Sequence, residues 1–129
     1  MREPGPEPFA LVNAAGGAPR AAGAMYEVVR LTRTIIESLN ARLTDESWVA
    51  ADDEYVGLGV RALVNGYWGF AATPYWTPEE AVRTATSAAA QAATNAKGPA
   101  RRVEWGHTPT GTWSWITPMT ADPVRISGE

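Results

Sequence analysis

The stretch that decides the fold runs from residue 55 to residue 72 and reads YVGLGVRALVNGYWGFAA. In its first half apolar residues occupy every second position, which is the pattern of a strand with one buried face. Asn65-Gly66 interrupts this run, and apolar residues resume at Tyr67. An Asn-Gly pair between two such runs predicts a type I′ turn, because both of its positions need a positive φ. We therefore predict a β-hairpin whose register places Arg61 opposite Phe70, a guanidinium beside an aromatic ring.

The segment after the hairpin carries the start and stop signals of one long helix. Thr77-Pro78 supplies an N-cap threonine and a proline at the first helical position, and Glu80 occupies the capping-box position. Gly98-Pro99 ends the helix near Lys97. The small side chains of its predicted buried stripe require the helix to lie close to the sheet. That stripe consists of Val82, Ala85, Ala89, Ala92, Ala93 and Ala96. Within the hairpin strands, the interior glycines likewise predict a close approach to the backbone: Gly57, Gly59 and Gly69.

Further strands are predicted on both sides of this core. Tyr26–Ile36 is rich in β-branched residues and predicts a strand. We expect a turn at Asn40-Ala41, a second strand within residues 42–50, a solvated acidic loop at Asp52–Glu54 and a last strand at Arg101–Trp105. The core face of the first strand is expected to carry Glu27, Val29, Leu31, Arg33 and Ile35. The fold class is therefore α+β, a mostly antiparallel sheet of about four to five strands with one long Ala-rich helix packed on one face.

The length of 129 residues fits a single domain. Residues 1–21 contain several prolines and predict a flexible or partly helical N-terminal arm, with a short helix over Phe9–Ala15. We assign residues 22–125 to the α+β domain and residues 126–129 to a tail.

Composition argues against several classes of partner. The net charge is −3, and Arg101-Arg102 is the nearest approach to a basic stripe, so we expect no nucleic-acid partner. No apolar run approaches the roughly 20 residues that span a bilayer, so we expect no membrane partner. The absence of cysteine fits a reducing compartment, and we expect a cytoplasmic protein. The abundance of Ala, Gly, Pro and Arg suggests a GC-rich bacterial genome.

The sequence offers few groups for catalysis. His107 is the single histidine and there is no cysteine, so neither an H-E-x-x-H pair nor a zinc-thiolate set exists. None of the serines lies in a G-x-S-x-G setting. We therefore predict no catalytic, cofactor-binding or metal-binding residue and no cofactor in this chain.

An arginine and four aromatic residues are the candidate contact residues for a partner or a peptide. Trp and Tyr anchor interfaces, and the loop before the helix is too rich in proline to bury all of its aromatic rings. The alternative is that these side chains pack in the core and cover sheet edges. The candidates are Arg61, Tyr75, Trp76, Trp113 and Trp115.

The hairpin and helix resemble the N-terminal domain of the TldD/TldE (PmbA) metallopeptidase family. The strand Val56–Leu63 shows that domain's G-x-G-x-R pattern, Asn65–Thr73 contains its G-F-A block, and Thr77–Lys97 supplies its alanine-rich helix. Gly23–Val29 is similar to the opening strand, with Met25 where an acid is usual, and Asp122–Val124 is similar to the segment that leaves the domain. The resemblance covers about residues 22–125.

This resemblance implies a zinc-peptidase assembly, often a heterodimer, that acts on peptides or on a peptide-like biosynthetic intermediate. In the family the helical H-E-x-x-x-H motif lies in the next domain, with a cysteine ligand after it. No position of this sequence matches a catalytic residue of the family. We therefore expect zinc in a partner, a catalytic TldD-like chain that carries the H-E-x-x-x-H motif. The sequence leaves open whether this chain is a separate subunit or a piece of a longer one.

Three functional hypotheses follow. The first is a non-catalytic subunit or domain of a TldD/TldE-type peptidase, which helps to enclose the active chamber and to dock the partner. The second is a stand-alone peptide- or ligand-binding module that has lost the peptidase part. The third is an unrelated small enzyme that uses scattered carboxylates.

Overall fold

The computed structural model describes residues 7–42, 45–98 and 103–122, with side chains described outside residues 39–50. These residues divide into two compact units. The first unit comprises residues 1–35 and 54–105, and the second comprises residues 36–53 and 106–129. Parts of the predicted arm (1–6), the Arg101-Arg102 pair and the predicted tail (126–129) lie outside the described residues.

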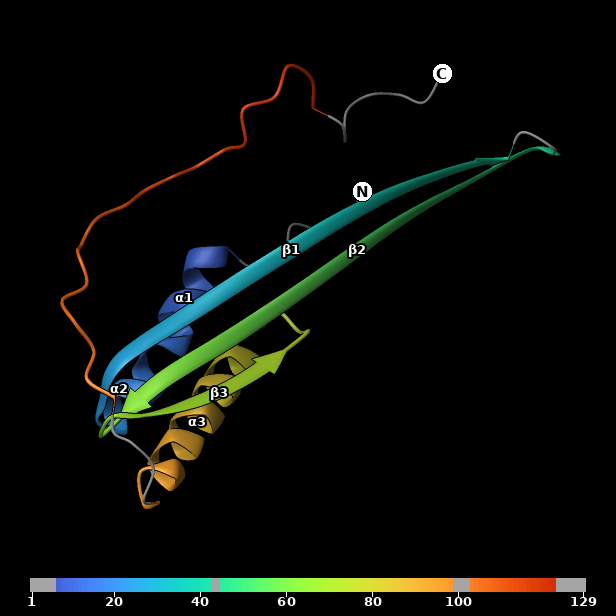
Figure 1. The fold of residues 1–129 in the computed structure, drawn as a ribbon. Helices are drawn as coiled ribbons and strands as arrows, with labels where there is room; N and C mark the ends of the chain where they lie inside the picture. The colour runs from blue at the N-terminus through green and yellow to red at the C-terminus, as the bar shows by residue number, and fades with distance from the viewer. Residues whose placement is uncertain (1–6, 43–44, 99–102, 123–129) are drawn as a thin grey trace. The chain divides into compact units, whose positions relative to one another are not determined.

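A three-stranded antiparallel sheet forms from the described residues, in the order β1-β2-β3. Its strands are β1 (Ala24–Arg42), β2 (Asp45–Val64) and β3 (Tyr67–Thr73), and Figure 1 shows β2 between the other two. The predicted hairpin is confirmed, because Arg61 pairs with Phe70. Asn65 and Gly66 make the turn with φ values of 50° and 85°, as a type I′ turn requires.

In the part of the chain that is described, three helices accompany the sheet, so the predicted α+β class is confirmed. They are α1 (Pro8–Ala15), α2 (Gly17–Ala21) and the long α3 (Pro78–Asn95). The core joins Leu11 of α1, alternate residues of β2 such as Leu58 and Val60, and the alanines of α3. Val29 and Leu31 of β1 pack against this core, as the sequence predicted for that face of the strand.

Helix α3 begins at the predicted cap. The Thr77 hydroxyl accepts a hydrogen bond from the Glu80 N–H at 3.2 Å, and Pro78 follows the cap. The Glu80 carboxylate does not reach back to Thr77, however. Instead it accepts hydrogen bonds from the Thr73 hydroxyl at 3.2 Å and from Arg83 at 2.7 Å, so it ties the end of β3 to the first turn of α3.

Side chains of α3 hydrogen-bond two main-chain groups of β3. The Gln91 side-chain oxygen accepts from the Phe70 N–H at 2.6 Å, and the Asn95 amide donates to the Trp68 carbonyl at 2.8 Å. Main-chain groups at a sheet edge otherwise need water or a further strand. The helix therefore satisfies these two groups without a further strand.

The close approach of α3 to the sheet depends on Gly69. A Cβ atom at this position would lie 2.0 Å from the Ala88 carbonyl oxygen and 2.5 Å from the Ala92 nitrogen. Gly59 is also restricted, because a Cβ there would lie 3.3 Å from the ring of Phe70. At Gly57 the prediction of a close neighbour is wrong, since no atom in the described part of the chain lies within 4 Å of its Cβ position.

Several sequence-based boundaries are wrong. The described residues form three strands instead of four to five, because Asp52–Glu54 continues β2 where a loop was expected. Arg33 Nε of β1 forms an ion pair with Glu54 Oε1 at 2.8 Å, and this attraction offsets the repulsion among the three carboxylates. Asn40 and Ala41 lie within β1 and not in a turn, and Val103–Trp105 is not a strand.

The face of α3 that is buried is rotated about the helix axis relative to the predicted face. Ala85, Ala89 and Ala92 are buried as predicted, but Val82 is 43% exposed. The remaining buried positions are Ala81, Thr84 and Ala88. Helix α3 contacts α1 and α2 as well as β3, and these additional neighbours bury a different arc of its surface.

Within the described residues, no helix is both long enough and apolar enough to cross a membrane.

Candidate functional site

The loop between β3 and α3 positions two of the predicted contact residues. The Thr73 hydroxyl accepts a hydrogen bond from the Tyr75 N–H at 3.3 Å while donating to Glu80. Thr73 is itself 7% exposed, so this small network anchors the loop to the buried end of the strand. Because its main chain is fixed at both ends, the loop holds the Tyr75 ring outward, where 63% of the residue is exposed.

Trp76 occupies the inner side of the same loop. Its ring is half-buried and packs against the core of the first unit. Its indole Nε1 is buried and has no hydrogen-bond partner among the described residues. An unsatisfied buried donor costs about 1–3 kcal/mol. The packing of Trp76 against the core agrees with the alternative in which these aromatic side chains pack in the core.

Arg61 lies on the face of the sheet opposite to the core. Its guanidinium carbon is 4.7 Å from the centroid of the Trp68 ring. Trp68 is two residues from Phe70, the register partner of Arg61, so it shares the same face of β3. The sequence placed the guanidinium beside Phe70, and the structure instead stacks it on this diagonal neighbour. The contact contributes about 0.5–1 kcal/mol at an exposed position.

The Trp68 ring also belongs to an aromatic cluster with Tyr26 and Trp105. The rings of Tyr26 and Trp105 have centroids 4.6 Å apart, and their planes are tilted by 33°. Trp68 meets both edge-on, at 6.0 Å from Tyr26 and 5.3 Å from Trp105. Val103 donates to the Gly66 carbonyl at 2.7 Å, which holds the chain before Trp105 against the hairpin turn.

Sequence reasoning did not single out Tyr26 or Trp105, and it weighed Trp68 with the other aromatic residues without including it among the candidate contacts. Trp68 was available from the hairpin register, because residues two apart on one strand share a face. The position of Trp105 could not be predicted in this way, because Trp105 lies in neither a strand nor a helix.

Trp113 and Trp115 belong to the second unit. They are 72% and 79% exposed, and Ile116 beside them is 81% exposed. The structure therefore brings Tyr75 and Trp76 together on one loop and assigns the two C-terminal tryptophans to a different unit. A common contact surface that includes all of them stays a prediction.

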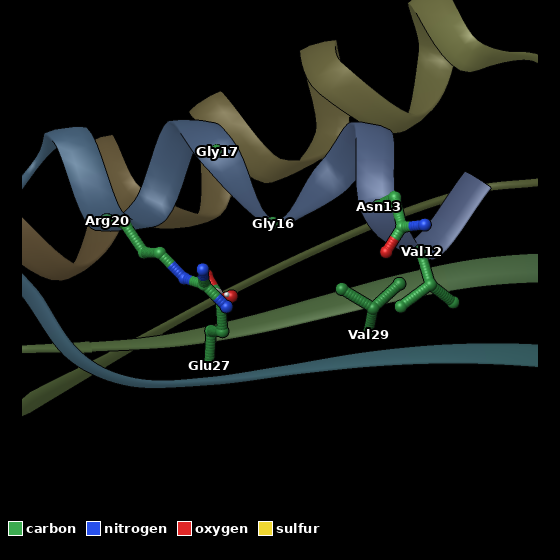
Figure 2. A pocket seen from close by; sticks show the side chains of 7 residues that line it. All are labelled: Val12, Asn13, Gly16, Gly17, Arg20, Glu27 and Val29. Carbon is green, nitrogen blue, oxygen red and sulfur yellow. Dashed lines mark hydrogen bonds and ion pairs between the residues drawn. The ribbon is translucent and has the colours of Figure 1, made fainter. Parts of the chain in front are cut away.

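A separate pocket lies within the first unit, between the two short helices and β1. Figure 2 shows Arg20 and Glu27 at one end, with Val12, Asn13 and Val29 at the other. Its volume is about 330 Å³. The α1–α2 junction completes the wall with Gly16 and Gly17.

At the charged end of this pocket, only one of the two Glu27 carboxylate oxygens has a described partner. Arg20 Nε donates to Glu27 Oε1 at 3.1 Å, while 78% of the arginine side chain and 17% of the glutamate side chain are exposed. The second oxygen, Oε2, is buried without a hydrogen-bond partner in the part of the chain that is described. Gly16 leaves room for the carboxylate, because a Cβ there would lie 3.2 Å from Oε1. Sequence analysis did not identify this pocket, although it placed Glu27 on the core face.

Comparison with known proteins decides the family. Residues 28–93 match the family described as PmbA/TldA metallopeptidase domain 1, which is just over half of the 129 residues. The chain belongs to this family. The match confirms the resemblance drawn from the hairpin and the helix. A comparison with curated proteins and one with solved structures give no match.

The PmbA/TldA match divides the candidate residues. Arg61, Tyr75 and Trp76 lie within residues 28–93, whereas Trp113 and Trp115 follow that stretch and Arg20 and Glu27 precede it. The metallopeptidase family implies zinc, which needs several His, Cys or carboxylate ligands. Among the described residues, no group of three or more such side chains is placed to hold a metal ion.

Proposed function

We propose that this chain supplies a non-catalytic domain to a TldD/PmbA-type zinc metallopeptidase assembly. The observation that carries the proposal is the match of residues 28–93 to domain 1 of a metallopeptidase family. The composition supports the non-catalytic part, since a sequence with one histidine and no cysteine supplies few ligands for zinc. The substrate of the assembly is a peptide or a peptide-like biosynthetic intermediate.

The partner in this proposal is a catalytic chain that carries an H-E-x-x-x-H motif and binds zinc, and the two form a heterodimer. Tyr75 supports a docking role because its aromatic ring is exposed, and beside it the indole N–H of Trp76 has no acceptor among the described residues. Aromatic anchors of this kind dominate the binding energy of many interfaces. Arg61 on the opposite face of the sheet and the exposed Trp113 and Trp115 are the further proposed contacts.

The proposal places the assembly in a bacterial cytoplasm. A cysteine-free sequence is compatible with a reducing compartment. A stand-alone ligand-binding module is the second candidate, and the pocket beside Glu27 favours it.

Co-purification with metal analysis tests the main proposal. The tagged chain is expressed together with a metallopeptidase chain that contains H-E-x-x-x-H, and each fraction is assayed for zinc and for cleavage of a fluorogenic peptide. We expect zinc and cleavage only in fractions that contain the second chain. Stoichiometric zinc and peptide cleavage by this chain alone would overturn the proposal.

Two matched variants locate the docking surface. Tyr75→Ala removes an exposed aromatic ring from the proposed contact, and Phe9→Ala removes one that is 76% exposed on α1. Loss of a central aromatic anchor costs about 2 kcal/mol or more, which is roughly a thirtyfold loss of affinity. We expect that loss for the first variant and little change for the second. Equal affinity of the two variants would remove Tyr75 from the interface.

A further inference from the structure

Glu27 differs from the other described carboxylates in how its two oxygens are used. One oxygen accepts from Arg20, and the other is buried with no partner among the described residues. Buried polar atoms are normally hydrogen-bonded, and a carboxylate accepts several hydrogen bonds at once. The last torsion of a glutamate side chain is broad, so a partial rotation of the carboxylate can bring the buried oxygen to the wall of the pocket while the other stays near Arg20. A donor bound in the pocket would supply the missing hydrogen bond.

The pocket favours a donor that carries a positive charge. Arg20 is 78% exposed, so water screens much of its attraction to Glu27 and much of its repulsion of a second cation. A cation within the pocket would approach the same carboxylate with less water between the charges. Charge-assisted hydrogen bonds to a carboxylate are shorter and stronger than neutral ones.

The other end of the pocket sets the chemistry of the rest of the ligand. Val12 and Val29 face the space there, and Figure 2 shows the Asn13 amide beside them. A volume of about 330 Å³ is at the small end of ligand pockets. It suits a short aliphatic group and one polar group that bonds an amide.

We propose that this pocket binds a primary ammonium group attached to a carbon with a short aliphatic side chain. Glu27 accepts from the ammonium, and the valines contact the aliphatic group. A free amino-acid derivative and the amino end of a peptide share this chemistry. The family match assigns no role to Arg20 or Glu27, because both precede residues 28–93. The inference does not depend on the proposed peptidase function.

Titration of the full chain, followed by ¹H–¹⁵N NMR spectra, tests the proposal. The probes are L-valinamide, N-acetyl-L-valinamide, which lacks the ammonium, and the tripeptide Val-Gly-Gly. We expect saturable shifts at residues 12–29 with L-valinamide, with a Kd on the order of 1 mM, and none with the acetylated compound. The tripeptide separates the two sources: binding at least as tight as that of L-valinamide assigns the site to peptide amino ends, and weaker binding assigns it to small amines. Absence of saturable shifts with both amines, or equal shifts with the acetylated compound, overturns the proposal.

Two glutamate variants provide the matched comparison. Glu27→Gln preserves the size of the side chain and removes its charge, and Glu37→Gln makes the same change at an exposed position of β1. We expect Glu27→Gln to weaken L-valinamide binding by at least about tenfold and Glu37→Gln to leave it within about twofold. Equal binding by the two variants contradicts the role of Glu27. If Glu27→Gln does not fold, the acetylated probe on the unmodified chain decides the question.

Discussion

Substitution of Gly69 by alanine tests how closely α3 lies against the sheet. The added Cβ would lie 2.0 Å from the Ala88 carbonyl oxygen, whereas ordinary contact begins at 3.4 Å. The second contact, to the Ala92 nitrogen at 2.5 Å, is also with main-chain atoms. Main-chain atoms cannot rotate away as a flexible side chain can, so the helix itself must move.

The expected loss of stability follows from these contacts. Overpacking typically costs about 1–3 kcal/mol, and contact with a helix backbone places Gly69→Ala at the upper end of that range. Replacement of a glycine inside a strand recovers roughly 0.5–1 kcal/mol of chain entropy. We therefore expect a net decrease of about 2 kcal/mol or more in the free energy of unfolding.

Gly57→Ala is the matched control. This glycine lies in β2, its φ is not positive, and no atom of the described residues lies within 4 Å of the Cβ position. We expect the control to gain about 0.4–1 kcal/mol. Urea unfolding monitored by tryptophan fluorescence measures both, and a loss of 2 kcal/mol lowers the midpoint by about 1–2 M. If Gly69→Ala is as stable as the unmodified chain, the close packing of α3 described above is wrong.

Three further predictions concern the cap, the turn and the buried indole. Thr77→Ala removes the N-cap acceptor of α3 and should lower the free energy of unfolding by about 1 kcal/mol, whereas Thr86→Ala at an exposed position within the helix should not. Gly66→Ala puts an alanine at a φ of 85° and should lower the free energy of unfolding by about 1–2 kcal/mol in the same assay. Asn65→Gly should retain the hairpin, because glycine adopts a positive φ without strain. Trp76→Phe removes an indole N–H that has no partner among the described residues, and it should change stability by no more than about 1 kcal/mol. It should nevertheless weaken capture of the catalytic chain in the co-purification assay. A large loss of stability on Trp76→Phe would show that the indole acts mainly in packing.

The sequence by itself determined those features whose causes lie within a few residues. Asn65-Gly66 specified the turn, and the turn then fixed the pairing of Arg61 with Phe70. Thr77-Pro78 specified the start of α3, because the cap and the proline act on the first turn alone. The same local patterns were sufficient to identify the family, since its match covers this hairpin and helix.

Only the tertiary structure decided features that depend on residues distant in sequence. Asp52–Glu54 reads locally as an acidic loop, but Arg33 on the neighbouring strand pairs with Glu54 and the triplet continues β2. Val82 has the side chain expected in a core, yet contacts of α3 with the short helices bury a different arc. The pocket beside Glu27 is lined by residues that are close in sequence, but it forms only because α1 and α2 pack against β1, the strand that follows them. Which side chains are buried, and which groups they pair with, depends on how the elements pack together. Neither hydrophobic periodicity nor capping signals encode that packing.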